Sequence, residues 1–154
     1  MALEIEYQEG QTPLDEEEKA GLRIPTITSR GELDEFEQLN IQKAIEWTVK
    51  NRWNAKKIFS EKFLLELHTR MYSDVWAWAG TFRRSDKNIG VPYYKIGIEL
   101  KVLLADALFW FDQGTYSAYE IAIRFKHRIV SIHCFPNGNG RHSRLIADII
   151  GAHL

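Results

Sequence analysis

The sequence has one cysteine, Cys134, and no long hydrophobic run. A single cysteine excludes an internal disulfide and favours a reducing, cytoplasmic location. The longest apolar stretch, Leu103 to Phe111, contains Asp106 and is too short to span a bilayer. The N-terminal segment MALEIEYQEG has no basic start followed by an apolar run, so we expect no secretory signal.

The sequence also lacks an excess of charge of either sign. Lys and Arg number 20 against 21 Asp and Glu, which gives a formal net charge of −1. Nucleic-acid and anionic-membrane binders need a clear basic excess, so we expect neither as a direct partner. Hydrophobic residues make up 45% of the 154 residues. This content is enough for the core of one packed domain and is incompatible with a disordered chain.

Residues 1–28 are predicted to form an N-terminal arm that leads into a domain over residues 29–154. Pro13 and the acidic run from Asp15 to Glu18 predict a short helix that Gly21 ends. We expect the acidic residues to form a solvated helix face.

The domain itself is predicted to be all-α, with one small β-hairpin. Ser29 and Glu32 form a capping box for a helix to about Lys50, and Ser117 and Glu120 form a second one. Further helices are predicted from about Ser60, over Leu100–Phe111 and from about Gly140 to the end. The first long helix carries an expected inward stripe of Leu33, Phe36, Leu39, Ala44, Ile45 and Thr48. Residues 81–94 place a polar stretch between two short apolar segments, which predicts the hairpin.

The most informative segment is SIHCFPNGNGRHSR, from Ser131 to Arg144. Here a tight turn joins two helices, and Gly138, Asn139 and Gly140 let backbone amides converge at the start of the second one. Those amides and the positive end of the helix dipole form an anion site. Arg141 and Arg144 are three residues apart and therefore share one helix face, where their guanidinium groups suit phosphate oxygens. The segment predicts a polyphosphate site.

His133 lies beside this site in the sequence and titrates near neutrality, so it is a candidate general base. A helix C-terminus favours the protonated imidazole, whereas a base must be neutral. Each feature also has a structural interpretation: a histidine satisfied in the core, a simple turn and two solvated arginines. Their occurrence together within twelve residues favours the functional one.

The segment from His133 to Arg144 resembles the signature of the Fic (Fic/Doc) family, H-x-F-x-[D/E]-G-N-G-R-x-x-R, at every fixed position except the acidic one. The stretch from Trp78 to Arg83 is similar to the Trp-Ala-Gly-x-x-Arg segment before the family's hairpin flap. The resemblance covers roughly residues 32–144 and is closest to the bacterial Fic proteins called mobile mystery protein B.

The resemblance implies a Fic-like helical domain that is a protein adenylyltransferase, moving AMP from ATP to a hydroxyl side chain of a target protein. It makes His133 the general base and Phe135 the anchor of the loop. Gly138, Asn139 and Gly140 would hold the α- and β-phosphates, Arg141 the β-phosphate and Arg144 the γ-phosphate. Mg²⁺ or Mn²⁺ would be the cofactor. The flap, about residues 81–94, would align the target by strand addition.

Two departures from the family pattern matter. Asn137 stands where the family has the acidic residue that binds Mg²⁺, and an uncharged amide oxygen is a weaker ligand for a hard cation. Thr28 to Glu32 matches the first five positions of the inhibitory pattern [S/T]-x-x-x-E-[G/N], but Leu33 fills the last. Glu32 is therefore a candidate autoinhibitory residue, and the helix cap is the alternative. The chain also stops thirteen residues after Arg141, earlier than Fic domains usually end.

Three other functions remain as alternatives. Asn137 could have turned the domain into a catalytically weakened nucleotide-binding or regulatory module. Phosphoryl transfer, as in Doc-like relatives, is disfavoured because Gly140 and Arg141 are intact. DNA binding is weakest, because no helix carries a cluster of base-reading residues. A regulatory or antitoxin partner is expected from the family.

Overall fold

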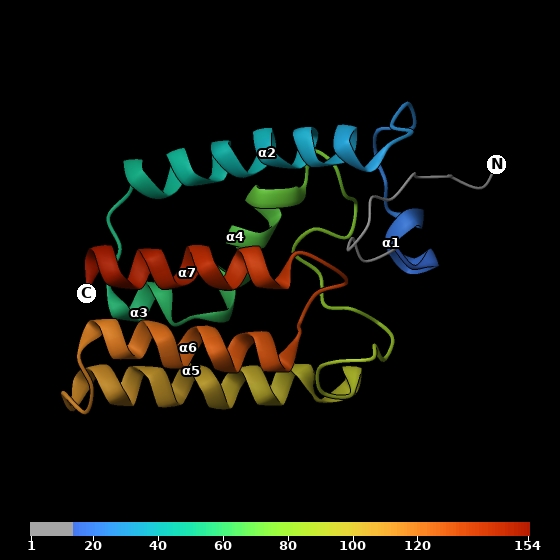
Figure 1. The fold of residues 1–154 in the computed structure, drawn as a ribbon. Coiled ribbons are helices and arrows are strands. Elements are labelled where there is room, and N and C mark those ends of the chain that lie inside the picture. Colours follow the sequence, from blue (N-terminus) through green and yellow to red (C-terminus); the bar gives the residue numbers. More distant parts are fainter. Residues whose placement is uncertain (1–13) are drawn as a thin grey trace.

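The computed structural model describes residues 14–154, which form a helical domain (Figure 1). Its helices, in chain order, are α1 (Glu16–Ala20), α2 (Arg30–Lys50), α3 (Ala55–Ile58), α4 (Glu61–Tyr72), the 3₁₀ helix η1 (Tyr93–Lys95), α5 (Ile96–Asp112), α6 (Ala118–Ile132) and α7 (Asn139–His153). The all-α prediction is confirmed, and α3 is an addition to it. Pro13 lies outside the described residues.

Serine side chains cap the start of three of these helices. The hydroxyl oxygens of Ser29, Ser60 and Ser117 accept hydrogen bonds from the backbone N–H three residues on, at 3.1 to 3.2 Å. Each bond satisfies one N–H that the first turn of a helix leaves unpaired. The predicted starts at these serines are therefore confirmed.

The helices pack in pairs around one apolar core. α6 packs along both α5 and α7, α4 contacts α7, and α2 packs along α4. In Figure 1, α1, the loop before η1 and the α6–α7 turn gather at one end of this bundle. No helix within residues 14–154 is long and apolar enough to cross a membrane.

The buried face of α2 differs from the predicted stripe. Leu33, Ala44 and Thr48 are buried as expected, but Phe36 and Leu39 are 37% and 65% exposed. Glu37 and Asn40 take the inward positions instead. The Asn40 amide donates to the Arg70 carbonyl at 2.9 Å and accepts from the Asp74 N–H at 2.9 Å. A polar side chain can therefore lie inside, because its bonds tie α2 to α4.

The predicted β-hairpin is not present. Over residues 81–92 the described chain forms bends and turns without a strand. The two sides of this loop bond to the end of α6 rather than to each other: Arg83 N–H donates to the Cys134 carbonyl at 2.9 Å and Val91 N–H to the Ile132 carbonyl at 3.3 Å. Backbone groups used in this way are not available for a two-stranded ladder.

Arg83 holds the loop from inside. Its side chain is buried, with 1% of the residue exposed, and its guanidinium donates to four backbone carbonyls. These carbonyls belong to Ser85, Val91, Ile132 and His133. One planar donor group thus replaces the ladder that the hydrophobic pattern predicted.

Candidate functional site

The α6–α7 turn adopts two left-handed backbone positions. His133 ends α6 with φ 58°, and Gly138 precedes α7 with φ 79°. A Cβ atom at Gly138 would lie 2.5 Å from the Tyr72 ring, so only glycine fits both the backbone angle and the space. The turn is therefore held against α4, with the N-terminal amides of α7 at its surface.

Two buried side chains shape the turn. The Asn139 amide accepts from Phe135 N–H at 2.9 Å and donates to the Phe135 carbonyl at 2.8 Å. Phe135 is buried, and its ring stacks on His68 with the centroids 3.6 Å apart. In this structure Asn139 closes the loop through its side chain, and Phe135 anchors it in the core.

His68 is a supporting residue that sequence reasoning missed. Its Nδ1 accepts from Gly80 N–H at 2.9 Å, which leaves the proton on Nε2 to donate to the Asn137 carbonyl at 3.0 Å. Burial, followed by the charge of His142, holds the pKa of His68 well below its usual range. The neutral ring thus joins the motif turn to the segment before the loop.

The predicted site residues line one open pocket of about 810 Å³. His133 and Asn137 lie on its wall together with Gly138, Asn139, Gly140, Arg141 and Arg144. Asp15, Glu18, Arg30 and Lys87 join them from other parts of the chain. The fold therefore gathers the candidate base and the predicted phosphate cradle around the same space.

The environment of His133 favours its neutral form. Burial lowers the pKa of the imidazole, and the positive charges of Arg83 and Lys87 lower it further. The sequence left open whether the helix end would keep this ring protonated. In the structure, burial and two cations act in the opposite direction, which is what a general base at neutral pH requires.

The two motif arginines are held differently. Arg141 donates to Glu37 Oε2 at 3.3 Å and lies over the Tyr72 ring, 5.1 Å from its centroid. Glu37 is buried and also accepts from Trp76 Nε1 at 3.2 Å. Arg144 is exposed and forms no hydrogen bond or ion pair within the described part of the chain. One arginine is preorganised and the other is free to meet an anion.

Glu37 was not predicted as a site residue. It sits at a position of α2 where the apolar pattern gave no signal, and only the packing of α2 on α4 brings it to Arg141.

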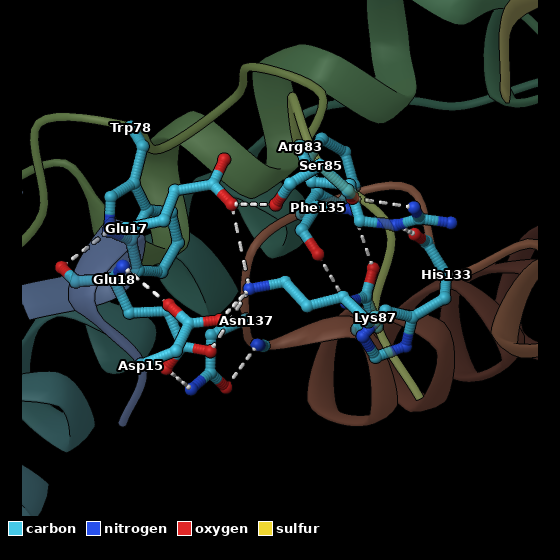
Figure 2. A network of polar contacts seen from close by, with 12 residues as sticks. Asp15, Glu17, Glu18, Trp78, Arg83, Ser85, Lys87, His133, Phe135 and Asn137 are labelled. Carbon is cyan, nitrogen blue, oxygen red and sulfur yellow. Dashed lines mark hydrogen bonds and ion pairs between the residues drawn. The ribbon is translucent and has the colours of Figure 1, made fainter. Parts of the chain in front are cut away.

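The acidic run from Asp15 to Glu18 is only in part the solvated face that the sequence predicted. Glu18 is 7% exposed, and Lys87 forms ion pairs with Asp15, Glu17 at 3.6 Å and Glu18 at 3.5 Å. Glu17 also accepts from Ser85 Oγ at 2.6 Å (Figure 2). The prediction is confirmed for Asp15 and Glu16, which are exposed, and wrong for Glu18, because docking of the arm on the basic loop buries this residue.

Backbone contacts hold α1 in this place. Ala77 N–H donates to the Gly21 carbonyl at 2.7 Å, and Arg23 N–H donates to the Val75 carbonyl at 2.8 Å. Trp78 Nε1 donates to the Glu18 carbonyl at 3.1 Å. Gly21, which ends the helix as predicted, has no room for a Cβ beside Trp78, at 2.2 Å.

Asn137 is engaged on both ends of its amide. Its Nδ2 donates to Glu18 Oε2 at 2.9 Å, and its Oδ1 accepts from Gly138 N–H at 2.6 Å. Burial raises the pKa of the Glu18 carboxyl, although the bond from Asn137 opposes this shift. Among residues 14–154, no group of three or more His, Cys, Asp or Glu side chains is arranged to hold a metal ion.

Glu32, the candidate autoinhibitory residue, lies at the start of α2. Its N–H donates to Ser29 Oγ at 3.1 Å, and its carboxylate accepts from Thr28 N–H at 3.4 Å. It is not among the residues that line the pocket. These contacts are those of a helix cap, and its autoinhibitory role stays a prediction.

The chain belongs to the Fic family. The model of the Fic/DOC family matches residues 58–150, more than half of the chain. This range contains the loop, α6, the motif turn and most of α7. No curated protein gives a significant match.

Solved Fic structures share the fold. The N-terminal Fic domain of the effector Bep8 from Bartonella sp. 1-1C has a TM-score of 0.67 and 19% identity, with 82% of this chain and 68% of that chain covered. BepC from Bartonella tribocorum, solved with bound AMPPNP, has a TM-score of 0.65 and 20% identity over 94% of this chain and 75% of that chain.

A third relative is the N-terminal Fic domain of a putative cell filamentation protein from Bartonella quintana, solved with bound ADP. It has a TM-score of 0.64 and 20% identity, and 82% of this chain and 69% of that chain are covered. Across the first four Fic structures, this chain spans between 35% and 75% of the other protein's length. The resemblance to mobile mystery protein B stays a prediction, since these matches establish the family and not that subgroup.

Proposed function

We propose that this protein transfers AMP from ATP to a hydroxyl group of a target protein. The observation that carries the proposal is the position of His133. Its imidazole has a lowered pKa and lies on the wall of the pocket that the α7 N-terminus and both motif arginines also line. A neutral base beside a polyphosphate cradle is the arrangement that an attack of a hydroxyl on a phosphate requires.

Each residue has a physical role in this proposal. The backbone amides of Asn139 and Gly140 receive phosphate oxygens, since the N-terminus of a helix offers unpaired donors. Gly138 N–H joins them by giving up its bond to Asn137 Oδ1. Arg141, held by Glu37, meets the β-phosphate, and Arg144 meets the γ-phosphate. His133 accepts the proton of the target hydroxyl, whose oxygen attacks the α-phosphorus while the bond from that phosphorus to the leaving pyrophosphate breaks. BepC and the Bartonella quintana domain, which hold AMPPNP and ADP, support a nucleotide at this site.

The proposed target is a protein with a Ser, Thr or Tyr hydroxyl that docks along residues 81–92. Asn88 and Ile89 of this loop line the pocket, and Ile89 is exposed. Without a hairpin, docking uses this exposed segment rather than a preformed strand. A regulatory or antitoxin partner and a cytoplasmic location also remain part of the proposal, with the single, buried Cys134 in support of the latter.

Mg²⁺ or Mn²⁺ is the proposed cofactor, and the chemistry of the donor set near the turn fits it. Mg²⁺ is usually held by one or two carboxylates together with substrate phosphates. Asn137 offers only an amide oxygen, but the Glu18 carboxylate lies 2.9 Å from its Nδ2. When bound, the cation would neutralise charge that develops on the phosphates.

The direct test is transfer of label from ATP that carries ³²P at the α-phosphate. We expect label on a target protein in a cell lysate or on the protein itself, and a loss of about 10²- to 10⁴-fold in His133→Ala. ATP labelled at the γ-phosphate should give no label, which separates adenylyl from phosphoryl transfer. Equal α-label transfer by the wild type and by His133→Ala would contradict the proposal.

The pH dependence should report the His133 environment. Because the pKa of His133 is lowered from 6.5, the ring is neutral at pH 7 and gains a proton only at lower pH. The single-turnover rate of AMP transfer should therefore be constant above pH 6.5 and fall about tenfold per pH unit below the lowered pKa. ADP affinity measured over the same range is the control. An acid limb centred above pH 6.5 would be the contrary result.

A second candidate is a nucleotide-binding module without catalysis, which the amide at Asn137 favours. It predicts that ADP binds while no α-label is transferred by the wild type or by a variant with a carboxylate at position 137. Transfer that appears or increases in that variant would instead indicate a weakened active site.

A further inference from the structure

In this protein the Fic motif lacks its carboxylate, and a carboxylate from another helix lies beside that position. The motif position is Asn137, and its side-chain amide donates to Glu18 Oε2 at 2.9 Å. Glu18 belongs to α1, far away in sequence, and is 7% exposed. Both residues line the pocket that contains the α7 N-terminus (Figure 2). An acid thus lies one hydrogen bond from the position where the family motif places one.

The surroundings of Glu18 already hold a cation. Lys87 reaches between α1 and the motif turn, and its ammonium is paired with Asp15, Glu17 and Glu18 (Figure 2). Three carboxylates around one ammonium leave an excess of negative charge when all are ionised. Arg30, Arg141 and Arg144 line the same pocket, so the negative charge is local to α1. A divalent cation of the nucleotide is favoured beside α1, while the arginines attract the phosphates.

Contacts on three sides keep Glu18 in place. Its backbone carbonyl accepts from Trp78 Nε1 and its N–H donates to Asp15 Oδ1, while Asn137 and Lys87 hold its two carboxylate oxygens. Glu16, two residues earlier, points to solvent, with 94% of its side chain exposed. The position of Glu18 is therefore specific within the acidic run.

We propose that Glu18 supplies the carboxylate for the divalent cation of the bound nucleotide, in place of the acidic residue that Asn137 replaces in the motif. The inference rests on the nucleotide site of the proposed function. It adds that α1, outside the range that the family model matches, completes this site. Glu18 approaches the cation from α1, and Asn137 orients it through the hydrogen bond to Oε2.

The test is ADP binding by calorimetry, with Mg²⁺ and with EDTA. In the wild type we expect Mg²⁺ to tighten ADP binding. In Glu18→Gln, which keeps the shape and an acceptor for Asn137, the Mg²⁺-dependent gain should fall about 10-fold or more. Affinity in EDTA should be unchanged or higher, because a negative charge has been removed. Glu16→Gln, on the same helix and facing solvent, should behave as the wild type.

A double variant tests whether the carboxylate can be moved back to the motif. Glu18→Gln combined with Asn137→Asp should recover the Mg²⁺-dependent gain. Asn137→Asp alone should not improve on the wild type, because it brings two carboxylates within a hydrogen-bond distance of each other. A double variant no better than Glu18→Gln would contradict the exchange of roles.

Two results would overturn the proposal. One is an unchanged Mg²⁺-dependent gain in Glu18→Gln. The other is an ADP affinity that rises in that variant by the same factor with and without Mg²⁺. Glu18 would then only repel the phosphates and would not bind the cation. Thermal melting of each variant shows whether it is folded. If Glu18→Gln alone does not fold, the double variant is compared with the wild type instead.

Mn²⁺ binding without nucleotide, measured by electron paramagnetic resonance, separates this inference from the proposed function. If ADP fails to bind the wild type at all, the proposed nucleotide site is wrong. Mn²⁺ binding still tests the role of Glu18 in that case. Weaker Mn²⁺ binding by Glu18→Gln than by Glu16→Gln supports this role, and equal Mn²⁺ binding contradicts it.

Discussion

Arg83→Met should lower the free energy of unfolding by about 3 kcal/mol or more. Methionine fills a similar apolar volume but donates no hydrogen bond. The carbonyls of Ser85, Val91, Ile132 and His133 would then lose their guanidinium partner. Buried carbonyls without a donor cost free energy, and each bond to a charged donor is worth about 1.5–3 kcal/mol. Urea unfolding of the wild type and of Arg83→Met measures the difference in the free energy of unfolding.

The same variant should also loosen the site. Two of the four carbonyls, those of Ile132 and His133, belong to the end of α6, and the other two belong to the loop at residues 81–92. Both segments contribute residues to the wall of the pocket. Arg84→Met is the matched control, because Arg84 is the exposed neighbour in the same loop. We expect that control to lie within about 0.5 kcal/mol of the wild type. An equally small effect of Arg83→Met would show that the guanidinium is not what holds the loop.

Gly138→Ala should be the most damaging single-methyl change in the motif turn. At φ 79° an alanine costs about 1–2 kcal/mol relative to its preferred backbone regions. Its Cβ would also lie 2.5 Å from Tyr72 ring atoms, and such overpacking costs roughly 1–3 kcal/mol more. The α7 N-terminus would have to move away from α4, so ADP affinity should fall together with stability. Calorimetry with ADP and urea unfolding measure the two effects.

Gly151→Ala is the control for this change. Gly151 lies inside α7, where a Cβ would meet no atom within 4 Å. Alanine should stabilise the helix there by about 0.5–1 kcal/mol and leave ADP affinity as it is. If Gly138→Ala bound ADP as tightly as Gly151→Ala, the phosphate cradle would have to lie elsewhere in the pocket.

Local signals in the sequence predicted much of the fold. Helix starts depend on a hydroxyl and an N–H three residues apart, so Ser29, Ser60 and Ser117 could be placed without knowing the packing. The motif turn is equally local, because Gly138 and the residues around it lie within one loop and one helix start. For this reason the sequence could name, one by one, the residues of this turn that line the pocket.

Features that depend on contacts between distant segments could not be predicted in this way. The loop at residues 81–92 has the hydrophobic pattern of a hairpin, but Arg83 reaches carbonyls that are some fifty positions away. Likewise the inward face of α2 follows from its contact with α4, which buries Glu37 and leaves Leu39 exposed. Periodicity along one segment contains no information about such partners.

By itself, the sequence determined a helical domain with a Fic motif, a candidate base at His133 and a missing acid at Asn137, since each is fixed by residues close together in the chain. Only the tertiary structure decided where α1 lies. In isolation its acidic run would be a solvated face, whereas docking against Lys87 and Trp78 brings Asp15 and Glu18 to the wall of the pocket. Glu18 and Asn137 are 119 positions apart, so the hydrogen bond between them exists only when the arm and the domain fold together.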